Sequence, residues 1–212
     1  MPGPELRPPQ PKRRLKPAER RSQIVDAAVA FFAEVGLEGR TRDLSARLGI
    51  GQSLLYKYFE SKEALIEAVF ERVYLDRLRP EWRDWLCDRT VPLRTRMLRF
   101  YTAYTEAIFT YEWMRIFMFS GLAKAKLNAR YLAHLHAAFL EPMRLEIAAA
   151  SDAHAAVEME DIWNLHGGIV YIGIRRFVYQ TPTPPDVGPA IERAIDRFLS
   201  DVVSVTGPSH PR

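Results

Sequence analysis

Apolar side chains recur at intervals of three and four residues along most of this chain, and this spacing constrains its fold more than any other feature. Ile24, Ala28, Phe31 and Val35 lie on one such stripe near the N-terminus. The same spacing appears in residues 155–180 and again in the segment from Ile191 onward. It is the spacing of one helix face, whereas a half-buried strand alternates at every second residue. Because no segment alternates in that way, we predict an all-α fold of roughly nine helices.

Proline and glycine divide this helical pattern into segments. The first 17 residues contain six prolines, a density that excludes helix. Pro80, Pro92, Gly121 and the run 181–185 punctuate the rest of the chain. The helices predicted between these breaks cover residues 18–35, 41–48, 52–58, 61–73, 93–119, 122–150 with a kink at Pro142, 155–180 and 187–205. Gly36 is the predicted end of the first helix, and Ser61 is the predicted N-cap of the fourth.

The positive charge is concentrated at the N-terminus. Residues 1–21 carry seven Lys/Arg and two Asp/Glu, whereas residues 22–62 are neutral and residues 63–212 are close to neutral. A basic arm beside a neutral domain suggests contact with phosphates, with Arg13 and Arg14 as candidates. A solvated tail without a partner explains the same composition equally well.

The sequence also bears on the cellular compartment. The single cysteine, Cys87, excludes an intrachain disulfide, and we expect it to be a buried structural residue. The N-terminus has no apolar signal-peptide core, and no segment reaches the roughly 18 apolar residues of a membrane span. We therefore expect a cytoplasmic protein that does not interact with membranes.

Residues 41–58, TRDLSARLGIGQSLLYKY, fit two short helices that cross steeply at a tight turn. Ser45 is small enough to let the second helix approach closely. Gly49 stands at the turn, where a positive φ penalises any side chain. The residues predicted to face inward are Leu44, Leu48, Ile50, Leu55 and Tyr58. The segment thus satisfies the requirements of a helix-turn-helix.

The second of these helices leaves polar side chains facing outward. Gln52, Ser53, Tyr56 and Lys57 are free to point away from the core. Glutamine can form a bidentate pair with adenine in the major groove. Lysine and tyrosine suit phosphate oxygens. We therefore predict that this helix reads duplex DNA.

Residues from about Arg20 to Phe70 resemble the DNA-binding domain of the tetracycline-repressor (TetR) family. The residues that carry the resemblance are Ile24-Val-Asp-Ala-Ala28, Phe32, Gly36, Thr41-Arg-Asp-Leu44, Leu48-Gly-Ile50, Leu55-Tyr-Lys-Tyr-Phe59 and Ser61-Lys-Glu-Ala-Leu65. They cover about a quarter of the chain. The remaining residues resemble the family only in length and helical layout.

The resemblance implies roles for individual positions. Phosphate contacts are implied for Thr41, Arg42, Tyr56, Lys57, Tyr58 and Lys62, and base-edge contacts for Gln52, Ser53 and Leu54. Two positions depart from the family pattern: Tyr58 stands where many members have histidine, and Arg40 where a capping Thr or Ser is common. For Leu54 and Tyr58, packing against the core remains an equal alternative.

The aromatic-rich middle of the chain is predicted to hold a small-molecule effector. Ligand pockets are mostly apolar with a few polar groups, and the candidates are Tyr104, Trp113, Phe117, Trp163 and His166. Simple core packing explains each of these residues at least as well. His134 and His136 are two residues apart and cannot share a metal. We expect no metal, no cofactor and no catalytic residues.

The last two long helices resemble the homodimer interface of the family. The predicted interface residues are Ile162, Leu165, Ile169 and Ile172 in the first helix and Ile191, Ile195, Phe198 and Val202 in the second. Gly167, Gly168 and Gly173 lie inside the first helix, where close approach of another helix would offset their low helix propensity. Packing of these faces within one chain is the alternative.

Together these features predict four parts: a disordered basic arm (1–17), a helix-turn-helix DNA-binding domain (18–65), a ligand-sensing and dimerisation domain (66–206) and a disordered tail (207–212). The predicted function is a transcription regulator, a repressor released from a palindromic operator by a small apolar or amphipathic molecule. Two other classes of protein fit the sequence less well. A helical enzyme or haem-binding bundle would need a recognisable set of catalytic or ligating residues, which the sequence lacks. An architectural DNA binder would not need the large aromatic domain.

Overall fold

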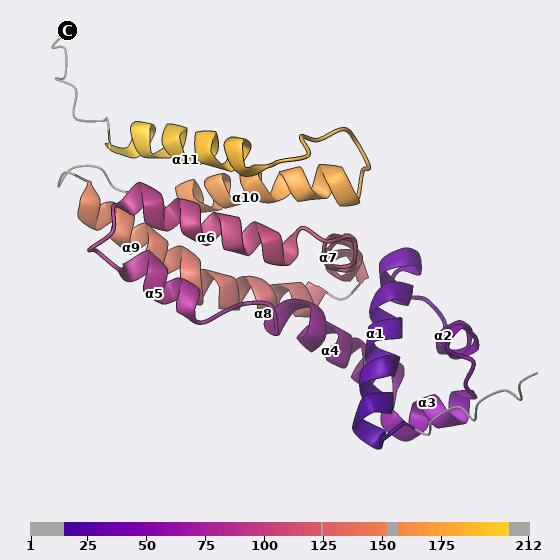
Figure 1. Cartoon of the computed structure of the whole chain (residues 1–212). Helices are drawn as coiled ribbons and strands as arrows, with labels where there is room; N and C mark the ends of the chain where they lie inside the picture. The colour runs from indigo at the N-terminus through magenta and orange to yellow at the C-terminus, as the bar shows by residue number, and fades with distance from the viewer. Residues whose placement is uncertain (1–14, 124, 152–156, 204–212) are drawn as a thin grey trace, which may run out of the picture.

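The computed structural model describes residues 15–123, 125–151 and 157–203. Every regular element in these residues is helical, which confirms the predicted all-α fold (Figure 1). The elements in chain order are α1 (Pro17–Val35), α2 (Thr41–Leu48), α3 (Gln52–Tyr58), α4 (Lys62–Phe70), the π-helical turn η1 (Glu71–Leu75), α5 (Glu81–Cys87), α6 (Leu93–Ile108), α7 (Tyr111–Ala123), α8 (Ala125–Leu135), the π-helical turn η2 (His136–Leu140), α9 (Glu141–Ala150), α10 (Met159–Phe177) and α11 (Gly188–Val203).

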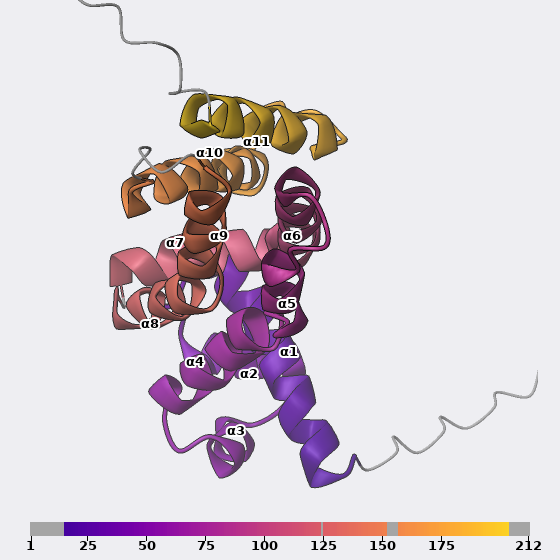
Figure 2. The same cartoon turned by 90° about the vertical axis from the view of Figure 1, so that its left-hand side faces the viewer.

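The helices form two bodies, which α4 and η1 connect along the chain and which pack together through α1 and α7. Figure 1 shows α1, α2 and α3 gathered at one end of the molecule and the bundle of α5 to α11 at the other. α10 and α11 lie side by side at the outer edge of this bundle, far from α3, in both Figure 1 and Figure 2. No helix among the described residues is both long and apolar enough to cross a lipid bilayer.

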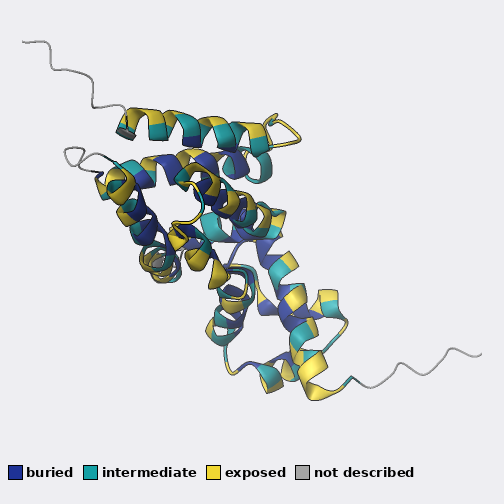
Figure 3. Ribbon diagram, turned by 60° about the vertical axis from the view of Figure 1, so that its left-hand side comes forward, coloured by how far each residue is buried: buried dark blue, intermediate teal, exposed yellow. Residues whose placement is uncertain are grey.

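The N-terminal body packs around the predicted apolar stripe of α1. Ile24 and Ala28 are fully buried, together with Leu44 of α2, Leu55 of α3 and Leu65 of α4. Val35, predicted on the same stripe, is the last residue of α1 and is exposed. Figure 3 shows that buried residues line the inside of each body and exposed residues its outside. The first residue of α1 is a proline, where its missing N–H costs nothing. Gly36 ends α1 with a φ of 81°, as its position in the sequence predicts.

The aromatic stretch 93–119 is not one helix, contrary to the prediction. α6 ends at Ile108, and α7 begins at Tyr111 and runs through Gly121 to Ala123. The side chain of Thr110 accepts a hydrogen bond from the backbone N–H of Trp113 at 3.2 Å, which is the pairing of a helix N-cap. A threonine N-cap therefore starts a new helix, α7, where neither glycine nor proline marks a break.

A short helix, α5, fills the region in which the sequence shows only an interruption at Pro80. Pro80 precedes α5, and its first turn contains Glu81 and Asp84, where the helix dipole favours acidic side chains. Seven residues are too few for a convincing periodicity, which explains why the pattern missed it. Cys87, expected to be buried, is the last residue of α5 and is exposed.

The kink predicted at Pro142 coincides with a change in helix geometry. The π-helical turn η2 ends at Leu140, two residues before Pro142, which stands in the first turn of α9. A proline ring clashes with the carbonyl four residues earlier and removes one helical hydrogen bond. A π-helical turn places an extra residue in the helix just where this conflict arises.

A cluster of charged side chains ties α9 to α5 and α6. Glu146 accepts hydrogen bonds from Arg89 at 3.0 Å and from the buried Arg96 at 3.0 Å. Arg96 also donates to the carbonyl oxygen of Leu86. The hydrogen bonds from Arg89 and Arg96 lower the pKa of Glu146. Because Arg96 is only 5% exposed, its charge depends on Glu146 for compensation.

We predict that Glu146→Gln destabilises the chain by about 2–3 kcal/mol, because it leaves the charge of Arg96 buried without a counter-ion. Glu141→Gln is the matched control, since Glu141 pairs with Arg144 on the same helix at a more exposed site and should cost less than about 1 kcal/mol. Urea unfolding measures both. Equal losses for the two variants would contradict the assigned role of Glu146.

Candidate nucleic-acid interface

The turn between α2 and α3 has the geometry that its sequence predicts. Gly49 adopts a left-handed conformation with φ 64° and ψ 33°. Its N–H donates to the carbonyl oxygen of Ala46 at 3.1 Å, and the N–H of Ile50 donates to that of Ser45 at 3.1 Å. These bonds satisfy carbonyls that the end of α2 would otherwise leave free. The turn therefore fixes the direction in which α3 leaves α2.

α3 has one buried and one exposed side. Leu55 is fully buried, and Tyr58 is half-buried and packs against the core. The side chains on the exposed side of α3 are Gln52, Ser53, Tyr56 and Lys57. Leu54 is half-buried at the boundary between the two sides. The helix thus presents the predicted polar residues to solvent, while Tyr58 contributes in part to packing.

Three side chains predicted to meet DNA bond to each other across the two helices. The hydroxyl groups of Thr41 and Tyr56 are 3.0 Å apart, and the side-chain amide of Gln52 donates to the Thr41 hydroxyl at 3.2 Å. Thr41 itself is only 8% exposed. Its hydroxyl therefore holds Gln52 and Tyr56 in place. The sequence does not reveal this role, because Thr41 lies on α2 whereas the other two residues lie on α3.

Positive groups flank α3 on both sides. Arg42 in the first turn of α2 has a side chain that is 73% exposed. Lys62 is half-buried and is the first residue of α4. Ser61 caps α4 by accepting a hydrogen bond from Ala64 N–H at 3.1 Å, as predicted. Arg13 and Arg14, the candidates in the arm, lie outside the described residues.

The start of α2 lacks a side-chain cap. Arg40 precedes the helix in an extended conformation, and its side chain makes no capping hydrogen bond. The first N–H groups of a helix have no partner inside the helix. A phosphate is a suitable acceptor for such groups, because the helix dipole also favours negative charge there.

The five predicted effector-site residues lie in or beside one cluster of aromatic rings. Trp113 stacks on Phe117 with ring centroids 5.0 Å apart, and Tyr104 contacts His166 at 5.2 Å. Trp163 contacts His166 edge-on at 5.8 Å. The sequence missed further members of this cluster, which are Tyr74, Phe100, Tyr101, Tyr131 and Phe139. The rings pack against one another in this conformation.

A few polar atoms are enclosed among these rings. The hydroxyl groups of Tyr104 and Tyr131 are 2.7 Å apart, and Tyr104 lies 3.5 Å from Nε2 of His166. Within the described residues, His166 Nδ1 and the Tyr101 hydroxyl have no hydrogen-bond partner. Burial lowers the pKa of His166 to about 4 and raises the pKa of Tyr101 and Tyr104. All of these groups are therefore neutral near pH 7.

The predicted dimer residues are distributed differently from the expectation. Ile162, Leu165, Ile169 and Ile172 of α10 are buried against the rest of the same chain, as are Ile191 and Ile195 of α11. Phe198 and Val202 are half-buried. Packing within the chain, the alternative weighed for these faces, therefore accounts for the six buried residues.

The opposite face of α10 is open. Gly167, Gly168 and Tyr171 are exposed. A Cβ atom added at Gly167 or Gly168 would meet nothing within 4 Å, whereas one at Gly173 would lie 2.5 Å from Met114. Elsewhere, no three His, Cys, Asp or Glu residues among those described are grouped so that they could hold a metal ion.

Comparison with known proteins finds relatives of the region that contains this geometry. Residues 24–69 match the family described as "Bacterial regulatory proteins, tetR family". The chain is 36% identical over 94 residues to the HTH-type transcriptional repressor KstR2 of Mycolicibacterium smegmatis, covering 44% of this chain and 45% of that protein. It is 32% identical over 85 residues to the class A tetracycline repressor protein of Escherichia coli, covering 36% and 39%. These matches span less than half of either relative.

Solved structures share the fold over nearly the whole chain. A putative TetR-family transcriptional regulator from Mesorhizobium loti matches with a TM-score of 0.57 and 15% identity, covering 91% of this chain and 98% of that one. A transcriptional regulator from Aquifex aeolicus matches with a TM-score of 0.57 and 16% identity, covering 86% and 98%. At this identity the likeness concerns the fold alone.

The buried His166 predicts a pH dependence of stability. The unfolded state, with a histidine pKa near 6.5, binds more protons than the folded state between pH 6.5 and about 4. The free energy of unfolding therefore decreases by about 3 kcal/mol in total as the pH falls from 6.5 to about 4. We expect His166→Phe to flatten urea-unfolding stability between pH 6.5 and 5. His134→Phe, which removes an exposed imidazole, controls for the substitution, and an unchanged slope in His166→Phe would contradict the prediction.

Proposed function

From the match of residues 24–69 to the tetR family of bacterial regulatory proteins, we propose that the chain is a member of this family that binds double-stranded operator DNA and regulates transcription. The observation that carries the proposal is the exposed side of α3, where Thr41 holds Gln52 and Tyr56 by hydrogen bonds. Side chains held in place before binding lose less conformational entropy when they meet a base or a phosphate. The region of the family match includes all three residues.

The proposed contacts follow from the groups that α3 and its neighbours expose. Gln52 would pair with a base edge in the major groove, beside Ser53 and Leu54. Tyr56 and Lys57 would contact phosphates, which fix the register of a protein on DNA without reading its sequence. The half-buried Tyr58 would make a further contact with the DNA backbone. Arg42, Lys62 and the N–H groups at the start of α2 would hold the flanking phosphates.

Repression relieved by a small effector is the proposed mode of regulation. The two sequence relatives are named as repressors, which favours repression here. The cluster of Tyr104, Trp113, Phe117, Trp163 and His166 offers an apolar environment with a few neutral polar groups, the composition of a ligand site. An apolar or amphipathic molecule would bind there by rearranging rings, and would shift the population towards a conformation with lower DNA affinity.

A homodimer is the proposed form that binds DNA. The open face of α10 carries Gly167, Gly168 and Tyr171, and all three are exposed in the part of the chain that the structure describes. Glycine lets a second helix approach closely, which would offset its low helix propensity. The half-buried Phe198 and Val202 of α11 would extend this contact. Two copies would then present two α3 helices to one operator.

Selection of bound sequences from random duplex DNA, at one stated salt concentration, tests the proposed function. We expect a palindromic motif whose half-sites lie one helical turn apart, about 34–36 Å, or somewhat more. Salt-sensitive binding without an enriched motif would contradict operator recognition, because phosphate contacts alone give such binding.

Two single substitutions separate base reading from phosphate contact. Gln52→Ala should relax the preference at one position of each half-site by roughly 1–3 kcal/mol. Lys62→Ala should weaken binding to all sequences alike and lower the salt slope by about one. Titrations with matched and mismatched operators at several salt concentrations measure both effects, with Lys126→Ala on α8 as the control. Unchanged specificity in Gln52→Ala would refute the base contact.

Gly168→Leu tests the proposed dimer face. In a single chain the new side chain enters open space, and leucine is a better helix former than glycine, so the fold should persist. In a dimer it would separate two closely packed helices. Light scattering should therefore show monomers for Gly168→Leu and dimers for Thr102→Leu, an exposed position on α6 that serves as the control. A Gly168→Leu protein that remains dimeric would place the interface elsewhere.

A further inference from the structure

The joint between the two bodies is held by two arginines that point in opposite directions. Arg72 in η1 donates to Asp26 of α1 at 2.5 Å and to Ser22 at 3.2 Å. Arg77, just after η1, donates from Nη1 to the carbonyl oxygen of Ala107 at 2.9 Å and to the Thr110 hydroxyl at 3.3 Å. Arg72 thus contacts α1 of the N-terminal body, and Arg77 contacts the bundle at the junction of α6 and α7.

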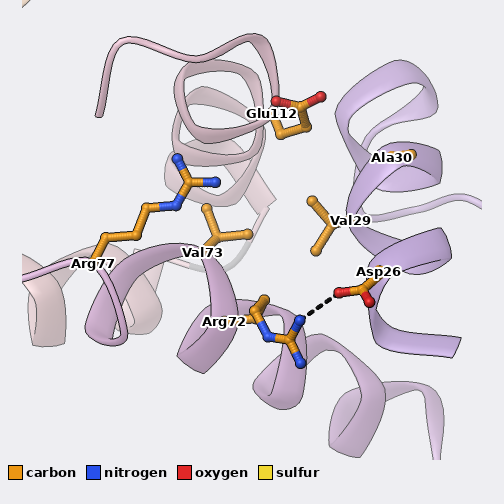
Figure 4. A pocket seen from close by; sticks show the side chains of 7 residues that line it. All are labelled: Asp26, Val29, Ala30, Arg72, Val73, Arg77 and Glu112. Carbon is orange, nitrogen blue, oxygen red and sulfur yellow. Dashed lines mark hydrogen bonds and ion pairs between the residues drawn. The ribbon is translucent and has the colours of Figure 1, made fainter. Parts of the chain in front are cut away.

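A cavity of about 300 Å³ lies between these two arginines. It is lined by Asp26, Val29 and Ala30 of α1, by Arg72, Val73 and Arg77, and by Glu112 of α7. Figure 4 shows the Arg72–Asp26 pair at one end, Arg77 and Glu112 at the other, and Val29 and Val73 between them. The volume is at the lower end of the range for ligand sites, so the cavity accommodates only a small molecule.

The charged groups at the Arg77 end of the cavity have few partners among the described residues. Glu112 makes no hydrogen bond or ion pair with any described residue, and Arg77 uses only Nη1 within the same part of the chain. The lining contains two arginines and two carboxylates. A simple anion would therefore be repelled by Glu112 and Asp26, and a simple cation by Arg72 and Arg77. A molecule with one group of each charge matches the lining.

We propose that this cavity at the joint binds a small zwitterion of the amino-acid class, whose carboxylate pairs with Arg77 and whose ammonium group pairs with Glu112. A short aliphatic side chain of the ligand rests on Val29 and Val73. Guanidinium–carboxylate bonds are charge-assisted and stronger than neutral ones. This site is separate from the aromatic cluster of the bundle, so the chain has places for two chemically different ligands.

The position of the site gives its occupancy a consequence. Its walls come from α1 in the N-terminal body, from α7 in the bundle, and from η1 and Arg77 in the connection between them. A ligand that contacts both walls favours the arrangement in which they face each other across this distance. Bound zwitterion therefore holds α1 against the bundle. An effect on operator affinity rests on the proposed function, whereas binding itself does not.

Calorimetry on the full chain without DNA tests the proposal. The probes are glycine, β-alanine, γ-aminobutyrate and L-valine, with isovalerate and isobutylamine as analogues that each lack one charge. We expect at least one zwitterion to bind about tenfold more tightly than both analogues, the factor that one charge-assisted contact supplies. Absence of binding by every zwitterion at millimolar concentration would overturn the proposal. No operator is present, so this failure would leave the proposed function untouched.

Glu112→Gln identifies the ammonium partner. The substitution keeps the size of the side chain and removes its charge at a position that bonds to no described residue. The preferred zwitterion should then bind about tenfold more weakly, while isovalerate binds as well as before or better. Glu106→Gln, at an exposed site on α6 outside the cavity, is the matched control and should change nothing. Equal zwitterion affinity in wild type and Glu112→Gln would overturn the assignment.

Discussion

The placement of the N-terminal body depends on a guanidinium group that caps the end of α1. Arg115 of α7 donates from Nε to the carbonyl oxygen of Ala33 at 2.6 Å, where α1 has no further N–H groups to satisfy its last carbonyls. A positive charge at this end also suits the helix dipole. The rings of Tyr111 and Phe119 lie about 5 Å from the same guanidinium group. Since α2 and α4 pack on α1, and α3 packs on α2, this cap helps to set where α3 lies relative to the bundle.

α7 connects three features that are otherwise separate. Its first turn supplies Glu112 to the cavity at the joint, its inner face supplies Trp113 and Phe117 to the aromatic cluster, and its outer face supplies Arg115 to α1. A change in ring packing therefore acts on the same rigid helix that holds α1. A second link runs from Arg130 of α8 to Glu67 of α4 at 2.5 Å. Under the proposed function, α7 and α8 are therefore the helices through which a bound effector would act on α1 and α4.

The sequence predicts features that local chemistry determines and misses those that depend on distant partners. The left-handed turn at Gly49 and the cap at Ser61 follow from one or two residues, and both were found. The bond between Thr41 and Tyr56 requires the crossing angle of two helices, so no spacing reveals it. Thr110 caps the start of α7 within an aromatic run that has neither glycine nor proline to mark the break. Periodicity shows that a face of α10 is buried, but it does not show whether the covering atoms belong to the same chain.

The three glycines of α10 resolve that last question in part, because they differ in what surrounds them. Each costs about 1 kcal/mol relative to alanine in a helix. At Gly173 the chain itself explains the choice, since a Cβ atom would collide with Met114 and Phe109. Gly167 and Gly168 face open space, and no contact within the described residues repays their cost. The apolar stripe and the glycine pair of one helix therefore lie on different sides: the stripe packs into the bundle, and the glycine pair lies on the exposed face proposed above for contact with a second copy.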